Sequence, residues 1–378
     1  MDKSPSASEE RGYRASPAAS SAIMLDLRTS GTDEKSIDYA LLPEIKGVHA
    51  VVSPADGTLK FQLHDYLVYC GGRYWCMWSQ GPPVEDEPSQ QVRYSTSDDG
   101  LTWSESKTLA GPLRDGYGCI ARGFWVRDGE LLALVAEYKG KGAFGVDKDL
   151  KLKAYAWNDR EKIWEYKDLV YDNAINNFSP QKLPDGEWMM SRRDARFNVF
   201  MLIGGVRTVH DWRSIPVVNF ITAIRSESKF RPDEPIWYPL PDGNLVSLFR
   251  DNGGSGRLFR AFSTDRGQTW STPVVVNFPN ATSKLFALRT RSGYWVLISN
   301  ANPAAGRRQL HLSISEDGLV FTRMAQLAIP SARPATLQYP HAIEHDGCLW
   351  VTFSRNKAQS EILKIPMSEI DALREKKK

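Results

Sequence analysis

The sequence contains few cysteines, little net charge and no long apolar run. Its 378 residues include 4 cysteines, with no C-x-x-C pair or Cys/His cluster, which argues against a disulfide scaffold and a structural zinc site. Lys and Arg number 48 against 45 Asp and Glu, so the net charge of +3 gives no reason to expect nucleic acid as a partner. Apolar runs such as Leu131 to Ala136 are far shorter than the roughly 20 residues that span a bilayer, so membrane insertion is not expected.

The two ends of the chain differ in composition from the middle. Residues 1–21 are rich in Ser, Ala, Glu and Arg and lack the apolar stretch of a secretory signal. This predicts a cytoplasmic location, or a periplasmic or secreted one if a signal has been removed. We expect a partly flexible extension over residues 1–46 and a charged tail over 367–378. Residues 47–366 are expected to fold as one domain, because the chain's 12 Trp, 14 Tyr and 15 Phe are too many rings to leave in water.

One short pattern recurs six times: a turn containing glycine, then an apolar run rich in aromatic and β-branched residues. The turn glycines are spaced by 57, 57, 57, 50 and 54 residues. Strand-like runs flank each turn, which is typical of a β-hairpin. The six glycines are Gly72, Gly129, Gly186, Gly243, Gly293 and Gly347.

A period near 50 residues with several strands per unit predicts an all-β fold, a six-bladed β-propeller of four-stranded antiparallel blades. A seven-bladed ring is the alternative. Residues 47–53 are expected to supply a strand that closes the ring on the last blade and so removes two exposed sheet edges.

A second motif, S/T-x-D-x-G-x-T-W, occurs within the same units at residues 96–103 and 263–270, with weaker copies at 313–321 and 157–164. It predicts a turn in which the Asp accepts backbone N–H bonds, the Gly takes positive φ and the Trp packs beneath. These motifs resemble Asp-boxes, and the sequence is similar to the sialidase-like (neuraminidase or BNR-repeat) β-propeller superfamily. The resemblance implies a structural role for the boxes.

In a propeller, ligands bind where the inner strands converge, at the mouth of the central channel. The relevant positions are the start of each first strand and the loop after each second strand. Here these positions carry arginines, histidines, carboxylates, amides and a tyrosine, a set suited to a hydroxylated, acidic sugar. The candidate binding residues are Arg122, Asn177, Arg193, Trp237, Arg250, Arg307, Arg355 and Lys357.

Five residues are candidates for catalysis. His64 suits general acid/base chemistry because imidazole titrates near neutral pH. Glu85 and Asp86 lie in a proline-containing loop, where paired carboxylates suit a general acid. Tyr339 and His341 are alternate residues of one expected strand and should face the same side. The structural alternatives, a strand-end histidine and a solvated acidic turn, stay open for these residues.

Sialidases of this superfamily use three arginines on the substrate carboxylate, a Tyr–Glu pair as nucleophile and an Asp as acid/base. The resemblance implies the nucleophilic role for Tyr339, which lies eight residues before Gly347, and the acid/base role for Asp86. Arg307 or Arg308 resembles the segment that supplies the third arginine.

The rest of that template is altered. The first arginine appears as His64, the second, expected just before Ser255, appears as Gly253-Gly254, and the glutamate appears as Tyr238-Pro239. Two missing arginines would remove several charge-assisted hydrogen bonds worth about 1.5–3 kcal/mol each, so an acidic sugar other than sialic acid is expected.

Three functions follow from these residues. The first is an exo-acting, sialidase-like glycoside hydrolase that cleaves a terminal, acidic sugar from an oligosaccharide or polysaccharide. The second is a polysaccharide lyase resembling those that cut terminal rhamnose from glucuronate, which acts by β-elimination with a His or Tyr base. The third is a non-catalytic, lectin-like propeller. No cofactor is required by any of them; a bound calcium ion and the oligomeric state are left open.

Overall fold

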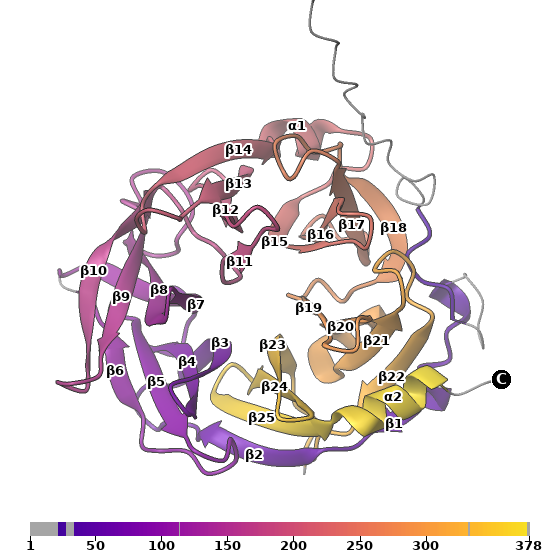
Figure 1. The fold of residues 1–378 in the computed structure, drawn as a ribbon, viewed down its shortest axis with the longest axis horizontal. Coiled ribbons are helices and arrows are strands. Elements are labelled where there is room, and N and C mark those ends of the chain that lie inside the picture. Colours follow the sequence, from indigo (N-terminus) through magenta and orange to yellow (C-terminus); the bar gives the residue numbers. More distant parts are fainter. Residues whose placement is uncertain (1–21, 28–33, 113, 332, 376–378) are drawn as a thin grey trace, which may run out of the picture.

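Six antiparallel sheets surround a central axis as the blades of a propeller (Figure 1). The structure is a computed structural model, and it describes residues 22–27, 34–112, 114–331 and 333–375. The first three strands of each blade run outward from the axis in chain order, so β3, β7, β11, β15, β19 and β23 face the axis. The predicted six-bladed propeller is confirmed.

The blades follow one another in sequence order. Blade 1 contains β3 (Phe61–Cys70), β4 (Arg73–Gly81), β5 (Gln91–Ser97) and β6 (Lys107–Ala110). Blade 2 contains β7 (Tyr117–Arg127), β8 (Glu130–Lys139), β9 (Lys151–Asn158) and β10 (Ile163–Asp172). Blade 3 contains β11 (Gln181–Lys182), β12 (Trp188–Arg193), β13 (Val199–Gly204) and β14 (Trp212–Val218).

Blade 4 contains β15 (Pro232–Pro239), β16 (Leu245–Asp251), β17 (Arg257–Ser263) and β18 (Val274–Pro279). Blade 5 contains β19 (Phe286–Arg289), β20 (Trp295–Ser299), β21 (His311–Ser315) and β22 (Arg323–Leu327), and β1 (Glu44–Ile45) adds to its outer edge in parallel. Blade 6 contains β23 (Leu337–His345), β24 (Cys348–Arg355), β25 (Gln359–Pro366) and β2 (Val48–Ser53). The short helices are η2 (Glu34–Ser36), η3 (Tyr39–Leu41), α1 (Phe220–Arg225), η4 (Pro303–Arg308) and α2 (Met367–Glu375).

Strand β2 closes the ring, as the sequence predicted. It pairs antiparallel with β25, so the last blade takes its outer strand from the start of the domain. The two ends of the domain are therefore held together by backbone hydrogen bonds, and the ring has no gap between its first and last blades.

The segments outside the ring are packed against it. Within the expected N-terminal extension, Met24, Leu25 and Leu27 are buried, and Leu25 forms a bridge with Phe321 of blade 5. The expected partial flexibility of residues 1–46 concerns positions that lie in part outside the described residues. At the other end, the expected charged tail instead begins as helix α2, because Met367, Ile370 and Leu373 form an apolar face that is buried against the ring.

The second strand of each blade is buried on both faces, because neighbouring blades pack against it. In β8, every residue from Leu132 to Ala136 has no exposed surface. This explains why these strands appear in the sequence as continuous apolar runs rather than as alternating ones. The cores between blades hold the ring rigid around its axis.

The Asp-boxes form the turns between the third and fourth strands. In blade 4, Asp265 Oδ1 accepts from the Thr269 backbone N–H at 2.8 Å, and Trp270 Nε1 donates to the Gly267 carbonyl at 3.1 Å. In blade 1 the motif as aligned over residues 96–103 predicts Asp98 as the accepting carboxylate. The backbone N–H groups of Leu101 and Thr102 instead donate to Asp99, the next residue.

Candidate functional site

A β-bulge recurs at the same point on the innermost strand of four blades. The ladder between first and second strands skips two residues in each case: 64–65 in β3, 122–123 in β7, 234–235 in β15 and 339–340 in β23. A bulge redirects a side chain that would otherwise follow the pleat. His64, Glu234 and Tyr339 adopt positive φ there, at 66°, 44° and 58°.

Positive φ in residues with bulky side chains costs on the order of 1–3 kcal/mol each, and such strain clusters at functional sites. The rigid blades on either side hold these residues in the strained conformation. The repeated bulge therefore gives a structural reason for side chains from different blades to meet at the mouth of the channel.

These side chains line one cavity of about 200 Å³ on the propeller axis. Its surface is almost entirely polar, and residues from all six blades contribute to it. The lining residues are His64, Glu85, Asp86, Arg122, Phe144, Ile175, Asn177, Arg193, Asp233, Glu234, Arg250, Arg307, Tyr339 and Lys357.

A glutamate, an arginine and a tyrosine are hydrogen-bonded in this cavity. Arg250 Nη1 donates to Glu234 Oε2 at 2.7 Å and to Tyr339 Oη at 3.2 Å. Burial alone raises the pKa of Glu234, but the charges of Arg250, Arg193 and Lys284 outweigh burial and lower it to about 2. Glu234 is therefore a carboxylate at neutral pH, held beside a phenol. Burial, and then the charge of Glu234, raise the pKa of Tyr339, so the phenol keeps its proton.

The cations of the cavity differ in how fully they are paired. Arg193 forms an ion pair with Asp233 and donates to Asn177 Oδ1 at 3.0 Å. Arg122 is 3% exposed, yet its Nε and Nη1 have no hydrogen-bond partner among the described residues. Leaving buried guanidinium N–H groups unpaired is costly, so an anionic ligand at Arg122 would gain the most from binding.

His64 is held in a defined orientation. Its Nδ1 lies 3.1 Å from Ser79 Oγ, and that Oγ accepts from the Ala121 backbone N–H at 2.9 Å. The Ser79 hydroxyl proton is thus free to point at Nδ1, which favours the imidazole proton on Nε2, 3.5 Å from Glu85 Oε1. Burial, and then the charge of Arg122, keep the pKa of His64 well below its usual range, so the ring is neutral.

Glu85 and Asp86 are adjacent carboxylates in different environments. Glu85 forms an ion pair with Lys357. Asp86 has φ of 59° and its Oδ1 has no partner among the described residues. Burial, and then the charge of Glu85, raise the pKa of Asp86 to about 6, although nearby cations such as Arg122 oppose the rise. Asp86 can therefore carry a proton at mildly acidic pH.

The structure brings together ten of the thirteen residues expected to form the site. From the catalytic candidates these are His64, Glu85, Asp86 and Tyr339, and from the binding candidates Arg122, Asn177, Arg193, Arg250, Arg307 and Lys357. Arg307 is anchored by donating to Gln338 Oε1 at 2.7 Å and to the Thr282 carbonyl at 2.6 Å.

Three predicted residues lie elsewhere. His341 is packed behind the cavity, where its Nδ1 accepts from the Leu67 backbone N–H at 3.2 Å. Trp237 is 2% exposed within the apolar core between blades 3 and 4. Arg355 forms an ion pair with Glu361 and lines a groove between blades 5 and 6.

Two acidic residues of the cavity were missed. The sequence comparison placed the expected glutamate at Tyr238-Pro239, but Glu234 lies four residues earlier, beside Asp233. The signal that could have located it is approximate spacing: Glu234 precedes its turn glycine, Gly243, by nine residues, whereas Tyr339 precedes Gly347 and His64 precedes Gly72 by eight. Arg250, a few residues before the position at which the template's second arginine was expected, donates to Glu234.

No group of three His, Cys, Asp or Glu side chains in the described part of the chain is arranged to hold a metal ion. None of the helices in the same residues is long and apolar enough to cross a membrane.

The fold and the cavity define a six-bladed propeller with a strained, highly charged axial site. The family model of the BNR repeat-like domain matches residues 72–351. The chain belongs to this family, and its propeller is of the sialidase-like type, as the Asp-boxes indicated.

Solved structures agree on the fold. A protein of unknown function from Dyadobacter fermentans has a TM-score of 0.66 and 16% identity, covering 86% of this chain and 100% of that one. A sialidase has a TM-score of 0.64 and 18% identity, covering 91% of this chain. Trypanosoma rangeli sialidase in complex with sialic acid has a TM-score of 0.61 and 15% identity, covering 88% of this chain. This chain spans 35% and 59% of those two sialidase chains. A search of curated proteins gave no match.

Proposed function

We propose that this protein is an exo-acting glycoside hydrolase that removes a terminal, acidic sugar from a glycan. The observation that carries the proposal is the hydrogen-bonded set Glu234–Arg250–Tyr339 in the same cavity as a carboxyl group, Asp86, whose pKa is raised to about 6. Environments that push the pKa values of two carboxyl groups apart are typical of acid/base catalysis. The cavity of about 200 Å³ lies below the usual range for larger ligands and suits a single sugar ring.

In this proposal Tyr339 is the nucleophile and Glu234 its base. The Tyr339 oxygen attacks the anomeric carbon while its proton passes to the Glu234 carboxylate. Protonated Asp86 donates its proton to the leaving glycosidic oxygen, and the resulting carboxylate then deprotonates the water that releases the sugar. Arg250 contacts both partners of the first proton transfer, so it fixes their positions throughout.

The arginines provide the specificity for an acid. Arg307 and Arg250 stand on neighbouring blades beside Tyr339, and Arg122, whose Nε and Nη1 have no hydrogen-bond partner among the described residues, lines the same cavity. His64 occupies the place where the family resemblance leads one to expect an arginine, and it is neutral. One cation of the sialidase pattern is therefore missing at His64, while Arg122 and Arg193 add cations on blades 2 and 3. This distribution of charge favours an acidic sugar whose anionic group is placed differently from that of sialic acid.

A lyase is the second candidate, because the neutral His64 ring contacts the Tyr339 ring, with 5.2 Å between centroids. A neutral imidazole beside a phenol could remove the proton next to a uronate carboxylate. The two functions differ in which side chain acts as the base. Hydrolysis requires Glu234 as a base for Tyr339, whereas β-elimination requires His64.

The test compares Glu234→Gln, His64→Gln and Tyr339→Phe with the wild type on a panel of acidic glycosides, including sialyl and uronyl substrates. We expect Glu234→Gln and Tyr339→Phe to lower kcat by about 10²–10⁴-fold, the usual contribution of a positioned proton-transfer group. His64→Gln should retain most of the rate. Wild-type turnover with Glu234→Gln active and His64→Gln inactive would favour the lyase, and binding without turnover would favour a lectin.

A further inference from the structure

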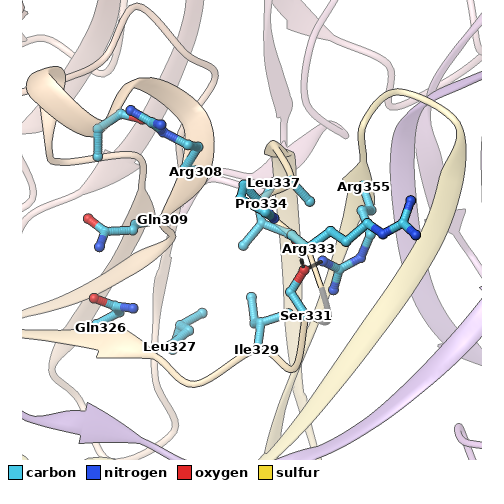
Figure 2. Close-up of a pocket in the computed structure, with 12 residues that line it drawn as sticks. Arg308, Gln309, Gln326, Leu327, Ile329, Ser331, Arg333, Pro334, Leu337 and Arg355 are labelled. Carbon is cyan, nitrogen blue, oxygen red and sulfur yellow. Dashed lines mark hydrogen bonds between the residues drawn. The ribbon is translucent and has the colours of Figure 1, made fainter.

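A second hollow lies beside the axial cavity, between blades 5 and 6. This groove encloses about 500 Å³, more than the cavity itself, and Figure 2 shows the residues that line it. Blade 5 supplies Arg308, Gln309 and Gln326 on one side, and Arg333 and Arg355 stand on the other (Figure 2).

The groove and the cavity share their walls. In helix η4, Arg307 lines the cavity and the next residue, Arg308, lines the groove. On β23, Tyr339 lines the cavity and Leu337 lines the groove. At the end of β24, Arg355 lines the groove, and Lys357, two residues beyond it, lines the cavity. Three separate segments thus turn one side chain to each hollow, so the groove lies next to the cavity.

The groove carries positive charge and no acidic side chain. Its lining contains three arginines, Arg308, Arg333 and Arg355, and none of its lining residues is Asp or Glu. Arg355 is neutralised by the buried carboxylate of Glu361, which lies outside the lining. Arg308 uses Nε to donate to the Ala305 carbonyl at 2.9 Å, and its side chain is exposed, as is that of Arg333. Two cations are therefore left to meet a ligand.

The remaining lining suits a sugar. Gln309 and Gln326 offer amide groups to hydroxyls, while Ile329 and Pro334 offer an apolar surface to a ring face. These groups, together with the exposed arginines, fit a hydroxylated ligand that bears a carboxylate or a sulfate.

We infer that this groove binds the sugar residues that follow the cleaved one, and that the substrate is an acidic oligosaccharide with carboxylate or sulfate groups beyond its terminal residue. The inference rests on the proposed function, because it assumes that the terminal sugar of the substrate binds in the axial cavity. If so, the affinity for a substrate depends on the number of its sugar residues and on the negative charge of those bound outside the cavity, which Arg308 and Arg333 contact.

The test measures binding to the full chain carrying Tyr339→Phe, in which turnover is expected to be about 10²–10⁴-fold slower. The probes are tetragalacturonate, a chondroitin sulfate tetrasaccharide, neutral cellotetraose and monomeric galacturonic acid, each titrated by calorimetry at low and high salt. The variant is Arg308→Glu with Arg333→Glu, and the matched control is Arg160→Glu in the exposed turn of the outermost hairpin of blade 2.

We expect at least one acidic tetramer to bind about tenfold more tightly than cellotetraose, because two exposed arginines would contact its anionic groups. High salt should reduce this difference in affinity because it screens those contacts. The double variant should lose the difference altogether. The control variant and the affinity for the monomer should be unchanged. Tighter binding of tetragalacturonate would show that carboxylates suffice, whereas tighter binding of the chondroitin sulfate tetrasaccharide, which carries carboxylates as well as sulfates, would show that sulfate groups add to the affinity.

Equal binding of acidic and neutral tetramers, or acidic binding that survives the double variant, would overturn the inference. A parallel loss of monomer affinity would also contradict it, because the effect would then come from the cavity. A single-stranded DNA oligomer that binds as tightly as the tetramers would show a general anion surface instead of a sugar subsite. If no glycan is cleaved but the charge-dependent binding persists, the proposed hydrolase fails while the groove stands.

Discussion

At the scale of single residues, the site separates two carboxyl groups by their surroundings. Glu234 is surrounded by Arg250, Arg193 and Lys284, whose charges hold its pKa near 2. Asp86 is buried beside Glu85, and its pKa is raised to about 6. Between these values one group is a carboxylate and the other an acid, the combination that glycoside hydrolysis requires.

This separation predicts the pH dependence of the enzyme. Catalysis needs Asp86 protonated, and its raised pKa means that the active form is present below pH 6 and is lost as the pH rises through about 6. Glu234 stays ionised throughout the weakly acidic range. We therefore expect kcat/KM to fall above about pH 6 with a slope of one proton, and Asp86→Asn to be inactive at every pH.

Measuring initial rates between weakly acidic and weakly basic pH checks this prediction. Glu85→Gln is the matched variant, because it removes the neighbouring charge that helps to raise the pKa of Asp86. Its profile should shift to lower pH while activity at the optimum is retained. A wild-type rate that rises through pH 6 would contradict the assignment of Asp86 as the acid.

Single residues were also where the sequence was hardest to interpret. Tyr339 and His341 are alternate residues, so simple alternation places them on one face. The bulge at residues 339–340 breaks that alternation and sends His341 behind the cavity. The bulge after Asp233 had the opposite consequence, because it brings Glu234 into the cavity from a stretch in which only Trp237 was predicted to face the site. The alternation of inward and outward residues along a strand, on which the prediction relied, does not reveal where a bulge inserts an extra residue.

At the scale of elements, the Asp-box turn joins neighbouring blades. Gly100 in blade 1 has φ of 74°, and a Cβ added there would lie 2.5 Å from the Trp350 ring of blade 6. The third box keeps the same pattern even though its sequence is weak, since Ser315 Oγ donates to Asp317 at 2.9 Å and Gly318 has φ of 75°. The hairpin glycines and these boxes could be identified from the sequence because each turn depends on a few local residues.

Gly100→Ala should therefore destabilise the protein by about 2–4 kcal/mol, from the left-handed backbone and from overpacking against Trp350. Gly129→Ala is the control: its φ is 84°, but nothing lies within 4 Å of the added Cβ, so only the backbone cost of about 1–2 kcal/mol applies. Denaturant unfolding of both variants measures the difference. Equal losses would contradict the proposed packing of the Asp-box against the adjoining blade.

At the scale of the whole molecule, ring closure explains why the site exists. The pairing of β2 with β25 fixes blade 6 beside blade 1, and this brings Tyr339 within ring contact of His64, although 275 positions separate them in the chain. The closing strand and the number of blades were predictable, because the repeat length and the need to cover sheet edges determine them. Helix α2 was not expected, since its few apolar residues are diluted by the charges around them.

The most direct test of the axial site as a hydrolase is mass spectrometry of products formed in oxygen-18 water. The substrates are sialyllactose and digalacturonate, and Tyr339→Phe is the control. We predict that the wild type releases an acidic monosaccharide carrying one oxygen-18 atom and that the control releases it about 10²–10⁴-fold more slowly. Release of an unsaturated sugar without oxygen-18, or recovery of both substrates intact, would contradict the account.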